Sequence, residues 1–371
     1  MSQPRKKFKS LSERVPNDIV FDILTQLPVK SIIRFRCVSK TCNSIITNPI
    51  FITTQFNLNQ AKSLSNNNNN NNGYVLYTTP SRQLCMVNCN SYSSLTRFEI
   101  PFFDDYTVHF CNGMFCLHGF HKPPIILWNP SIRKYKMLPP TQFTDPFVHV
   151  SVGLAFHSQN NDFKILRIFC FQGSKLPLYE AEVYTLSTNS WRKVVISLES
   201  LNGCVPQRCT RCIFFNGALQ CLVYTQESSF ILSFDVSNER FREIMLPPNY
   251  LDGVFWHSER LAVFKGLLAL IVCGVDLREE SGICHIWVMK KYGVVKSWTK
   301  RSLRVDYFVE SFGCTVNGEL LIQRIFPFRI VSFDPESLKE EILEIPSLGN
   351  LTYIANFNDN LVLLDGVNIS S

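Results

Sequence analysis

Apolar residues recur with helical spacing near the start of the chain, between residues 15 and 51. Ile19, Ile23 and Leu27 follow one another every four residues, and Val20 and Leu24 lie beside them. Because a helix turns once in about 3.6 residues, this spacing gathers the apolar side chains on one face. The segment therefore predicts an amphipathic helix.

Residues typical of helix starts and ends divide the segment into three short predicted helices. Proline suits the first position of a helix, acids suit its first turn, and serine suits the N-cap. The marking residues are Pro16, Asp18 and Asp22 for the first helix, Pro28, Ile32, Ile33 and Phe35 for the second, and Ser39, Cys42, Ile45, Ile46 and the closing Pro49 for the third. So small a unit falls below the roughly 40 residues that a domain usually needs to fold alone. We therefore expect its apolar surface to be covered either by another molecule or by the rest of the same chain.

A polar stretch follows the predicted helices. Residues 66–72 are an uninterrupted asparagine run behind a serine-rich lead, and Gly73 ends it. Polar tracts bury little apolar surface. Residues 56–73 are therefore predicted to link a helical domain, residues 11–55, to a β domain, residues 74–371, with residues 1–10 as a basic disordered tail.

From Tyr74 onward, short β-type runs alternate with turn residues, and one hairpin recurs. Five copies of it occur: three follow one pattern closely, and two, over residues 287–300 and 333–346, are looser. The five copies end at intervals of 46 to 55 residues. That period is typical of a four-stranded propeller blade. The best copies place two aromatic residues seven apart, as Trp128/Tyr135, Tyr184/Trp191 and Phe234/Phe241.

A tight turn precedes most copies of the hairpin. Asn-Gly supplies the positive φ that a type I′ turn requires, and the turns are Asn112-Gly113, Asn216-Gly217, Lys265-Gly266 and Asn317-Gly318. We predict a six-bladed, kelch-like β-propeller, closed when the last strands, near residues 353–364, join the first. An irregular β sandwich of two sheets is the alternative.

Composition and charge narrow the classes of function. The chain is 46% hydrophobic and 18% charged, as globular proteins are. The net charge is +7, but residues 1–50 hold nine Lys/Arg against three Asp/Glu, so the remainder is nearly neutral. A neutral body argues against a nucleic-acid-binding face. The basic run Arg5, Lys6, Lys7 and Lys9 is either a solvated tail or a short nuclear-import or nucleic-acid signal.

No secretory or membrane signal is evident. Polar and basic residues follow Met1, and the longest apolar run, residues 261–273, contains Lys265 and is shorter than the ~20 residues that a membrane span needs. That run is predicted to be a pair of buried strands. We expect a location in the cytoplasm and/or nucleus, no membrane partner, and 14 cysteines in the reduced state.

The candidate chemical sites are weak. The spacing C-x4-C-x-H-x2-H is unusual for zinc, and a C-x2-C without a second pair is a weak metal signal. Paired carboxylates are expected to be solvated, and we find neither a phosphate-binding loop nor a nucleophile elbow. We therefore predict no catalytic residue, metal or cofactor. The groups considered are Cys111, Cys116, His118 and His121; Cys209 and Cys212; and the pairs Glu279-Glu280 and Glu340-Glu341.

The order V-P, I-x-x-x-I, L-P, I-I-R-F, V-S-K and P-x-F over residues 15–51 resembles the F-box. F-boxes bind the Skp adaptor of cullin-based ubiquitin ligases, so the resemblance implies a Skp-type adaptor, and through it a cullin, as partners. Val15 stands where the family usually has Leu, and Cys42 where it usually has Trp, which removes a large anchor. The adaptor-binding residues implied by position are Val15, Pro16, Ile19, Ile23, Leu24, Leu27, Pro28, Ile32, Phe35, Val38 and Lys40.

The β domain also resembles a known family. The pieces NGMFCLHG, ILWNPSIRKYKMLP, GLAFHSQNNDFKILRI, EVYTLSTNSWRKV, FNGALQCLV and ILSFDVSNERFREIMLP, in this order, are similar to the F-box-associated domain of plant F-box proteins, the S-locus F-box-like and F-box-kelch-like groups among them. In that family the domain captures the protein to be ubiquitinated.

These observations predict a non-catalytic substrate receptor of a Skp–cullin–F-box ubiquitin ligase. The loops expected to carry specificity are residues 102–108, 172–178 and 200–211, because binding residues concentrate on loops over a rigid scaffold. Two alternatives remain. One is a β-propeller enzyme or small-molecule-binding protein whose helices are a docking tag, and the other is an F-box protein that binds the adaptor without promoting ubiquitination.

Overall fold

A computed structural model describes most of the chain, and its residues group into two compact units. One unit holds residues 1–67, 129–136 and 358–371, and the other holds residues 68–128 and 137–357. The described residues are 15–65, 74–78, 84–88, 95–98, 106–119, 124–141, 148–171, 180–196, 208–225, 228–276, 278–279, 281–305, 309–315, 317–324, 329–343, 345, 351–354, 357–363 and 367–368. The basic run and the asparagine run lie outside these ranges.

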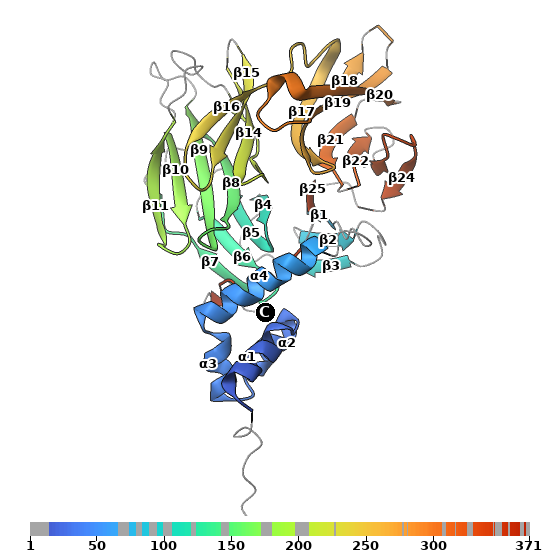
Figure 1. Cartoon of the computed structure of the whole chain (residues 1–371). Coiled ribbons are helices and arrows are strands. Elements are labelled where there is room, and N and C mark those ends of the chain that lie inside the picture. Colours follow the sequence, from blue (N-terminus) through green and yellow to red (C-terminus); the bar gives the residue numbers. More distant parts are fainter. Residues whose placement is uncertain are drawn as a thin grey trace, which may run out of the picture. The chain divides into compact units, whose positions relative to one another are not determined.

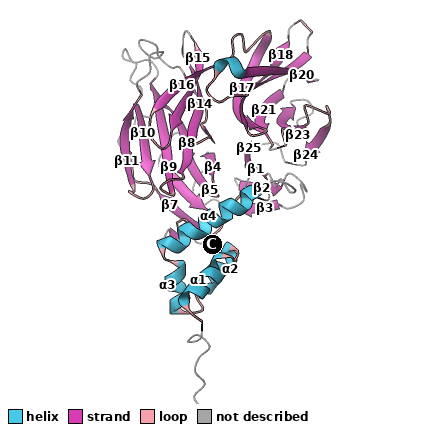
Figure 2. Cartoon of the chain, viewed as in Figure 1, coloured by secondary structure: helices cyan, strands magenta, loops and turns pink. Residues whose placement is uncertain are grey.

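The first of these units, called here the helical unit, has four helices among its described residues rather than the three predicted (Figures 1 and 2). They are α1 (Asn17–Thr25), α2 (Val29–Phe35), α3 (Lys40–Ile46) and α4 (Pro49–Ser65). Ser39 caps α3 as predicted, accepting a hydrogen bond from the Cys42 N–H at 3.0 Å. Pro16 lies at the N-cap of α1, one residue before the predicted first helical position.

Helix α4 corrects the predicted linker. Pro49 follows the end of α3 but also begins α4, since proline is well suited to a first helical turn. Residues 56–65 are therefore helical. The prediction missed this because the helix is fixed by packing: Phe51, Gln55 and Phe56 are all at most 3% exposed.

The described strands form six sheets of four or five strands. In spatial order, the first sheet holds β25 (Leu351–Ile354), β1 (Tyr74–Thr78), β2 (Leu84–Asn88) and β3 (Leu95–Phe98). The second holds β26 (Val367–Asn368), β7 (Lys134–Met137), β6 (Ile126–Asn129), β5 (Met114–Gly119) and β4 (Tyr106–Cys111). The third holds β11 (Ser190–Val195), β10 (Glu180–Thr185), β9 (Asp162–Phe171) and β8 (Val148–His157).

The other three sheets follow in chain order. The fourth holds β12 (Arg208–Cys209), β14 (Ala218–Tyr224), β15 (Ser229–Asp235) and β16 (Phe241–Met245), with β13 (Ile213–Phe215) also paired to β14. The fifth holds β17 (Val254–Phe264), β18 (Leu267–Asp276), β19 (Ser281–Met289) and β20 (Trp298–Val305), with the short helix η4 (Val295–Ser297) before β20. The sixth holds β21 (Val309–Cys314), β22 (Leu320–Arg324), β23 (Arg329–Phe333) and β24 (Glu340–Leu343).

This arrangement is a β-propeller, not the alternative sandwich of two sheets. It shows five blades rather than the predicted six, because five sheets are each built on at least four consecutive strands. The remaining sheet is composite, because β25 pairs antiparallel with β1, Tyr74 lying opposite Ile354. The predicted joining of the chain's late and early strands is thus present, and it uses residues 351–354, slightly before the predicted stretch.

Three of the four predicted tight turns have the expected backbone. Asn112-Gly113, Asn216-Gly217 and Lys265-Gly266 all have positive φ at both residues, as a type I′ turn requires. The last of these joins β17 to β18, which confirms the predicted strand pair at residues 261–273.

Two of the three best aromatic pairs lie directly opposite each other in the ladder. Tyr184 pairs with Trp191, and Phe234 with Phe241, with ring centroids 5.3 and 4.9 Å apart. The fourth hairpin differs from the simple pattern, because Trp298 lies opposite Met289 rather than Trp287. Its longer turn shifts the register by two residues.

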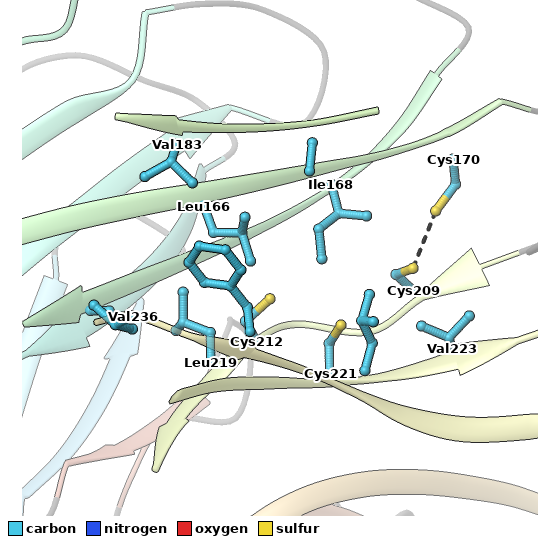
Figure 3. Close-up of a cluster of buried hydrophobic side chains, with 14 of the residues drawn as sticks. Leu166, Ile168, Cys170, Val183, Cys209, Cys212, Leu219, Cys221, Val223 and Val236 are labelled. Atoms are coloured by element: carbon cyan, nitrogen blue, oxygen red, sulfur yellow. Dashed lines mark hydrogen bonds between the residues drawn. The ribbon is translucent and has the colours of Figure 1, made fainter. Parts of the chain in front are cut away.

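Buried side chains of adjacent sheets form the propeller core. Figure 3 shows one cluster, in which residues of β9 and β10 face residues of β12, β14 and β15. Leu166, Ile168 and Val183 come from one sheet, and Leu219 and Val223 from the next. Alternating strand residues thus supply apolar faces that pack between blades.

One pair of cysteines departs from the predicted reduced state. Cys273 on β18 and Cys284 on β19 form a disulfide, and their Cα atoms are 4.1 Å apart. The two residues are directly opposite in the ladder. Neither the sequence separation of 11 residues nor the composition shows that register, so the prediction was wrong at this pair.

Gly274 is expected to be irreplaceable beside a β-bulge. The ladder between β17 and β18 shifts register between Phe255 and Ser258, and Trp256 has a φ of +45°. A Cβ on Gly274 would lie 2.5 Å from the Phe255 carbonyl oxygen. We expect Gly274→Ala to lower the free energy of unfolding by about 1–3 kcal/mol, the range typical of overpacking. Urea unfolding would measure it, with Ser281→Ala as the control, and equal stability of the two variants would contradict the expectation.

Candidate functional site

The helical unit has a small core of its own. All four helices contribute fully buried apolar side chains to it, and Phe21 packs edge-on against Phe51 with ring centroids 5.2 Å apart. The helical residues of this core are Leu24, Val29, Ile32, Ile46 and Phe51. They fix the relative positions of α1 and α2, and therefore also of the side chains that point outward from these helices.

Two of the predicted adaptor-binding residues belong to this core. Leu24 is 2% exposed and Ile32 is fully buried, while Leu27 is half-buried against the same cluster. A buried side chain does not reach a partner, so Leu24 and Ile32 lie behind the exposed side chains and not among them. Helical spacing places them beside the outward residues but does not say which face turns inward.

The other predicted residues are exposed. On α1 and just before it, Val15, Ile19 and Ile23 are 45%, 46% and 55% exposed. At the end of α2 and in the turn after it, Phe35 and Val38 are 38% and 68% exposed. Pro16, Pro28 and Lys40 are exposed as well. We call the five apolar residues Val15, Ile19, Ile23, Phe35 and Val38 the apolar surface of the helical unit.

Exposed apolar side chains indicate a binding surface when they project from the same face of a helix. Ile19 and Ile23 are one helical turn apart and therefore project from the same side of α1. Large apolar side chains left in water reduce stability, and patches of them mark surfaces that bind other proteins. The helical unit therefore presents a surface suited to an apolar protein partner.

Cys42 lies at the edge of this arrangement. It is half-buried and packs against the helical core, and its backbone N–H is held by Ser39 Oγ. A thiol fills little volume at this position of α3.

The described members of the first cysteine and histidine group lie on β4 and β5. His109 and His118 stack at 5.4 Å between ring centroids, and Cys111 and Cys116 are buried. His121 lies outside the described residues. Among the residues that the structure describes, no group of three or more His, Cys, Asp or Glu side chains has the geometry to hold a metal ion.

The C-x2-C pair has neighbours that the sequence did not indicate. Cys170 on β9 donates a hydrogen bond to Cys209 at 3.2 Å between the sulfurs, and Cys221 on β14 is buried in the same cluster as Cys212 (Figure 3). Hydrogen bonding by Cys209 and burial raise the pKa of both Cys170 and Cys221. These thiols are therefore protonated and act as packing groups.

Thiol labelling tests this assignment. Of the described free cysteines, Cys37 is exposed, Cys42 is half-buried and the others are buried. Since each unit of raised pKa lowers the thiolate fraction about tenfold, we expect iodoacetamide to modify Cys37 in the native protein, and Cys170 and Cys221 only after unfolding. Peptide mass spectrometry would measure the order. Labelling of Cys170 as fast as Cys37 would contradict it.

Charged groups in the propeller are engaged in ion pairs. Glu182, 2% exposed, accepts a bond from the Arg167 guanidinium at 2.5 Å. Of the carboxylate pairs, Glu279 bonds Arg304 and Glu340 bonds Arg324, both near the surface. These contacts hold strands and turns together, and Glu182, Glu279 and Glu340 each have a cationic partner.

The predicted specificity loops are mostly outside the described residues. Of residues 102–108, only 106–108 are described, and they belong to β4. Residues 172–178 are not among those described, and of residues 200–211 the described part begins with β12. No described helix has the length and apolarity needed to cross a membrane.

Comparison with known families matches this architecture. The profile of the F-box associated beta propeller domain matches residues 85–324, from within β2 to the end of β22. The chain belongs to this family. The F-box domain profile matches residues 12–54, which cover α1, α2, α3 and the start of α4. The predicted recognition of both domains is confirmed.

Several plant proteins align with most of the chain. An F-box protein of Arabidopsis thaliana is 29% identical over 342 residues, covering 86% of this chain and 82% of the relative. An F-box/kelch-repeat protein of the same plant is 25% identical, covering 77% and 78%. The F-box protein CPR1, also from Arabidopsis thaliana, is 24% identical, covering 89% and 84%. The chain therefore aligns with plant F-box proteins along most of its length.

Proposed function

We propose that this protein is the substrate-recognition subunit of a Skp–cullin–F-box ubiquitin ligase. The apolar surface of the helical unit carries the proposal, because the F-box motif and the exposure of Val15, Ile19, Ile23, Phe35 and Val38 coincide. A Skp-type adaptor would cover these side chains, with Pro16, Pro28 and Lys40 at the same surface. Leu24, Leu27 and Ile32 would hold the surface from within.

The propeller is the proposed target-binding domain. The five blades and the composite sheet would act together as its scaffold. The target would be a protein captured by loops on this scaffold. The cytoplasm or nucleus, where cullin ligases act, would be the location.

The proposed mechanism involves no bond chemistry in this chain. Binding the adaptor at one domain and the target at the other would raise the target's effective concentration near the ubiquitin-charged enzyme held by the cullin. Specificity then resides in the target interface, and catalysis in another subunit.

Reconstitution tests the proposal. The full chain would be co-expressed with a Skp-type adaptor, and the complex purified by a tag on the adaptor. We expect a stoichiometric complex that recruits a cullin and supports ubiquitin transfer. A folded chain that does not associate with the adaptor would overturn the proposal, and an adaptor complex that recruits a cullin without any ubiquitin transfer would favour a non-degradative F-box protein.

A further inference from the structure

The core of the helical unit is not made by the helices alone. Leu361 is fully buried, and it packs in the same cluster as Leu24, Ile32 and Phe51. Ile132, from the turn between β6 and β7, is half-buried against this cluster. Two segments far from the F-box motif in sequence therefore supply part of its hydrophobic core.

A buried pair of asparagines holds the segment that carries Leu361. Asn129 and Asn360 are both fully buried. Asn129 Nδ2 donates to the Asn360 side-chain oxygen at 2.7 Å and to the carbonyl oxygens of Asn360 and Val362 at 3.0 and 2.8 Å. The carbonyl groups that accept these bonds belong to the residues directly before and directly after Leu361. Because polar groups removed from water must be paired, the contact is selective for this arrangement.

Further hydrogen bonds join the same segment to α4 and to the turn. Asn59 Nδ2 on α4 donates to the Asp359 carbonyl oxygen at 2.9 Å. Ser131 Oγ donates to Asp359 Oδ1 at 2.6 Å, and the Ser131 N–H donates to Asn129 Oδ1 at 3.0 Å. Residues 359–362 are thus hydrogen-bonded both to helix α4 of the helical unit and to residues 129–131.

We infer that Leu361, held in place by Asn129 and Asn360, is a positioning residue for the adaptor-binding surface. Leu361 lies in the same buried cluster as Leu24, the direct neighbour of the exposed Ile23 on α1, and Ile32, which lies one turn before the exposed Phe35 on α2. Adaptor affinity should therefore depend on a residue more than 300 positions from the F-box motif. The part of this inference that concerns affinity rests on the proposed function, whereas the part that concerns the core does not.

Because the helical unit is small, we expect adaptor affinity to depend strongly on Leu361. Helices this short are marginal unless tertiary contacts support them, and the five buried helical residues form a small core. Removing one further buried side chain leaves a cavity that such a unit closes only in part. The conformation that binds the adaptor would then be less populated, and the apparent affinity would fall by the same factor.

Hydrogen exchange and adaptor binding, measured on the full chain, test the inference separately. The variants are Leu361→Ala and Leu361→Val, and the matched control is Leu363→Ala, which removes the same atoms from a half-buried residue outside the cluster. In Leu361→Ala we expect about 30-fold or greater loss of protection in peptides from α1, α2 and α3. Peptides from β18 and β19 should keep their protection. Adaptor affinity should fall by about tenfold or more, with smaller effects for Leu361→Val and none for Leu363→Ala.

The outcomes separate the two proposals. Unchanged protection of α1 to α3 in Leu361→Ala would overturn the inference, and so would equal losses in Leu361→Ala and Leu363→Ala. Lost protection together with lost affinity supports it in full. If the wild-type chain ignores the adaptor while Leu361→Ala still loses protection in α1 to α3, the proposed function fails and the role of Leu361 in the helical core stands. If Leu361→Ala is insoluble, Leu361→Val decides by the same readouts.

Discussion

Replacing Ile23 with aspartate is expected to weaken adaptor binding by roughly 30-fold or more while the protein stays folded. Ile23 is 55% exposed on α1, so a carboxylate there remains hydrated in the free chain. Exposed substitutions of this kind usually change stability by about 0.5 kcal/mol or less. In the complex the same carboxylate would face an apolar partner without a counter-charge, and the loss should reach about 2 kcal/mol or more, which is roughly 30-fold in affinity.

The structure changes how this variant should be interpreted. Helical periodicity places Ile23 on the apolar face of α1, but the inward position belongs to Leu24, which is 2% exposed. Ile50→Asp is a matched control, because Ile50 is 69% exposed at the start of α4 and is not among the predicted adaptor-binding residues. Calorimetric titration with the adaptor and thermal unfolding by circular dichroism would measure both properties. Equal affinity of the two variants would contradict the proposed surface.

Acidification is expected to destabilise the propeller through a buried histidine pair. Burial lowers the pKa of His118 to about 4, and burial together with the neighbouring His118 and Arg211 lowers the pKa of His109 well below its usual value. The unfolded chain therefore binds more protons than the folded one between about pH 6.5 and pH 4. The stability is fully present above pH 6.5 and is lost as the pH falls through this window. Between pH 7.5 and 4.5 we expect a loss of about 2 kcal/mol or more from His118 alone.

Urea unfolding at the two pH values would measure this loss. The double variant His109→Gln/His118→Gln cannot take up these protons, so its stability should depend less on pH than that of the wild type. His257→Gln is the control, since His257 is solvent-exposed on β17. An unchanged pH dependence in the double variant would show that other groups govern acid unfolding.

Local patterns in the sequence were enough to predict the architecture. The spacing of Ile19, Ile23 and Leu27, the Ser39 cap and the Asn-Gly turns all depend on interactions within a few residues, and the structure has them where the sequence places them. The hairpin repeat likewise reports on neighbouring strands, so the propeller could be predicted from its period. These features can be predicted from the sequence because backbone geometry and short-range packing determine them.

Contacts between distant segments were decided only by the tertiary structure. The continuation of α4 through Ser65, the Cys273–Cys284 disulfide and the inward position of Leu24 and Ile32 depend on what lies opposite each residue in space. Leu361 is the extreme case, because nothing in its local sequence indicates that it fills the core of the F-box helices. The sequence determined by itself that this protein has an F-box-like helical unit and a bladed β domain; which side chains face a partner and which complete the core was settled by long-range packing, because burial depends on neighbours that the linear order does not specify.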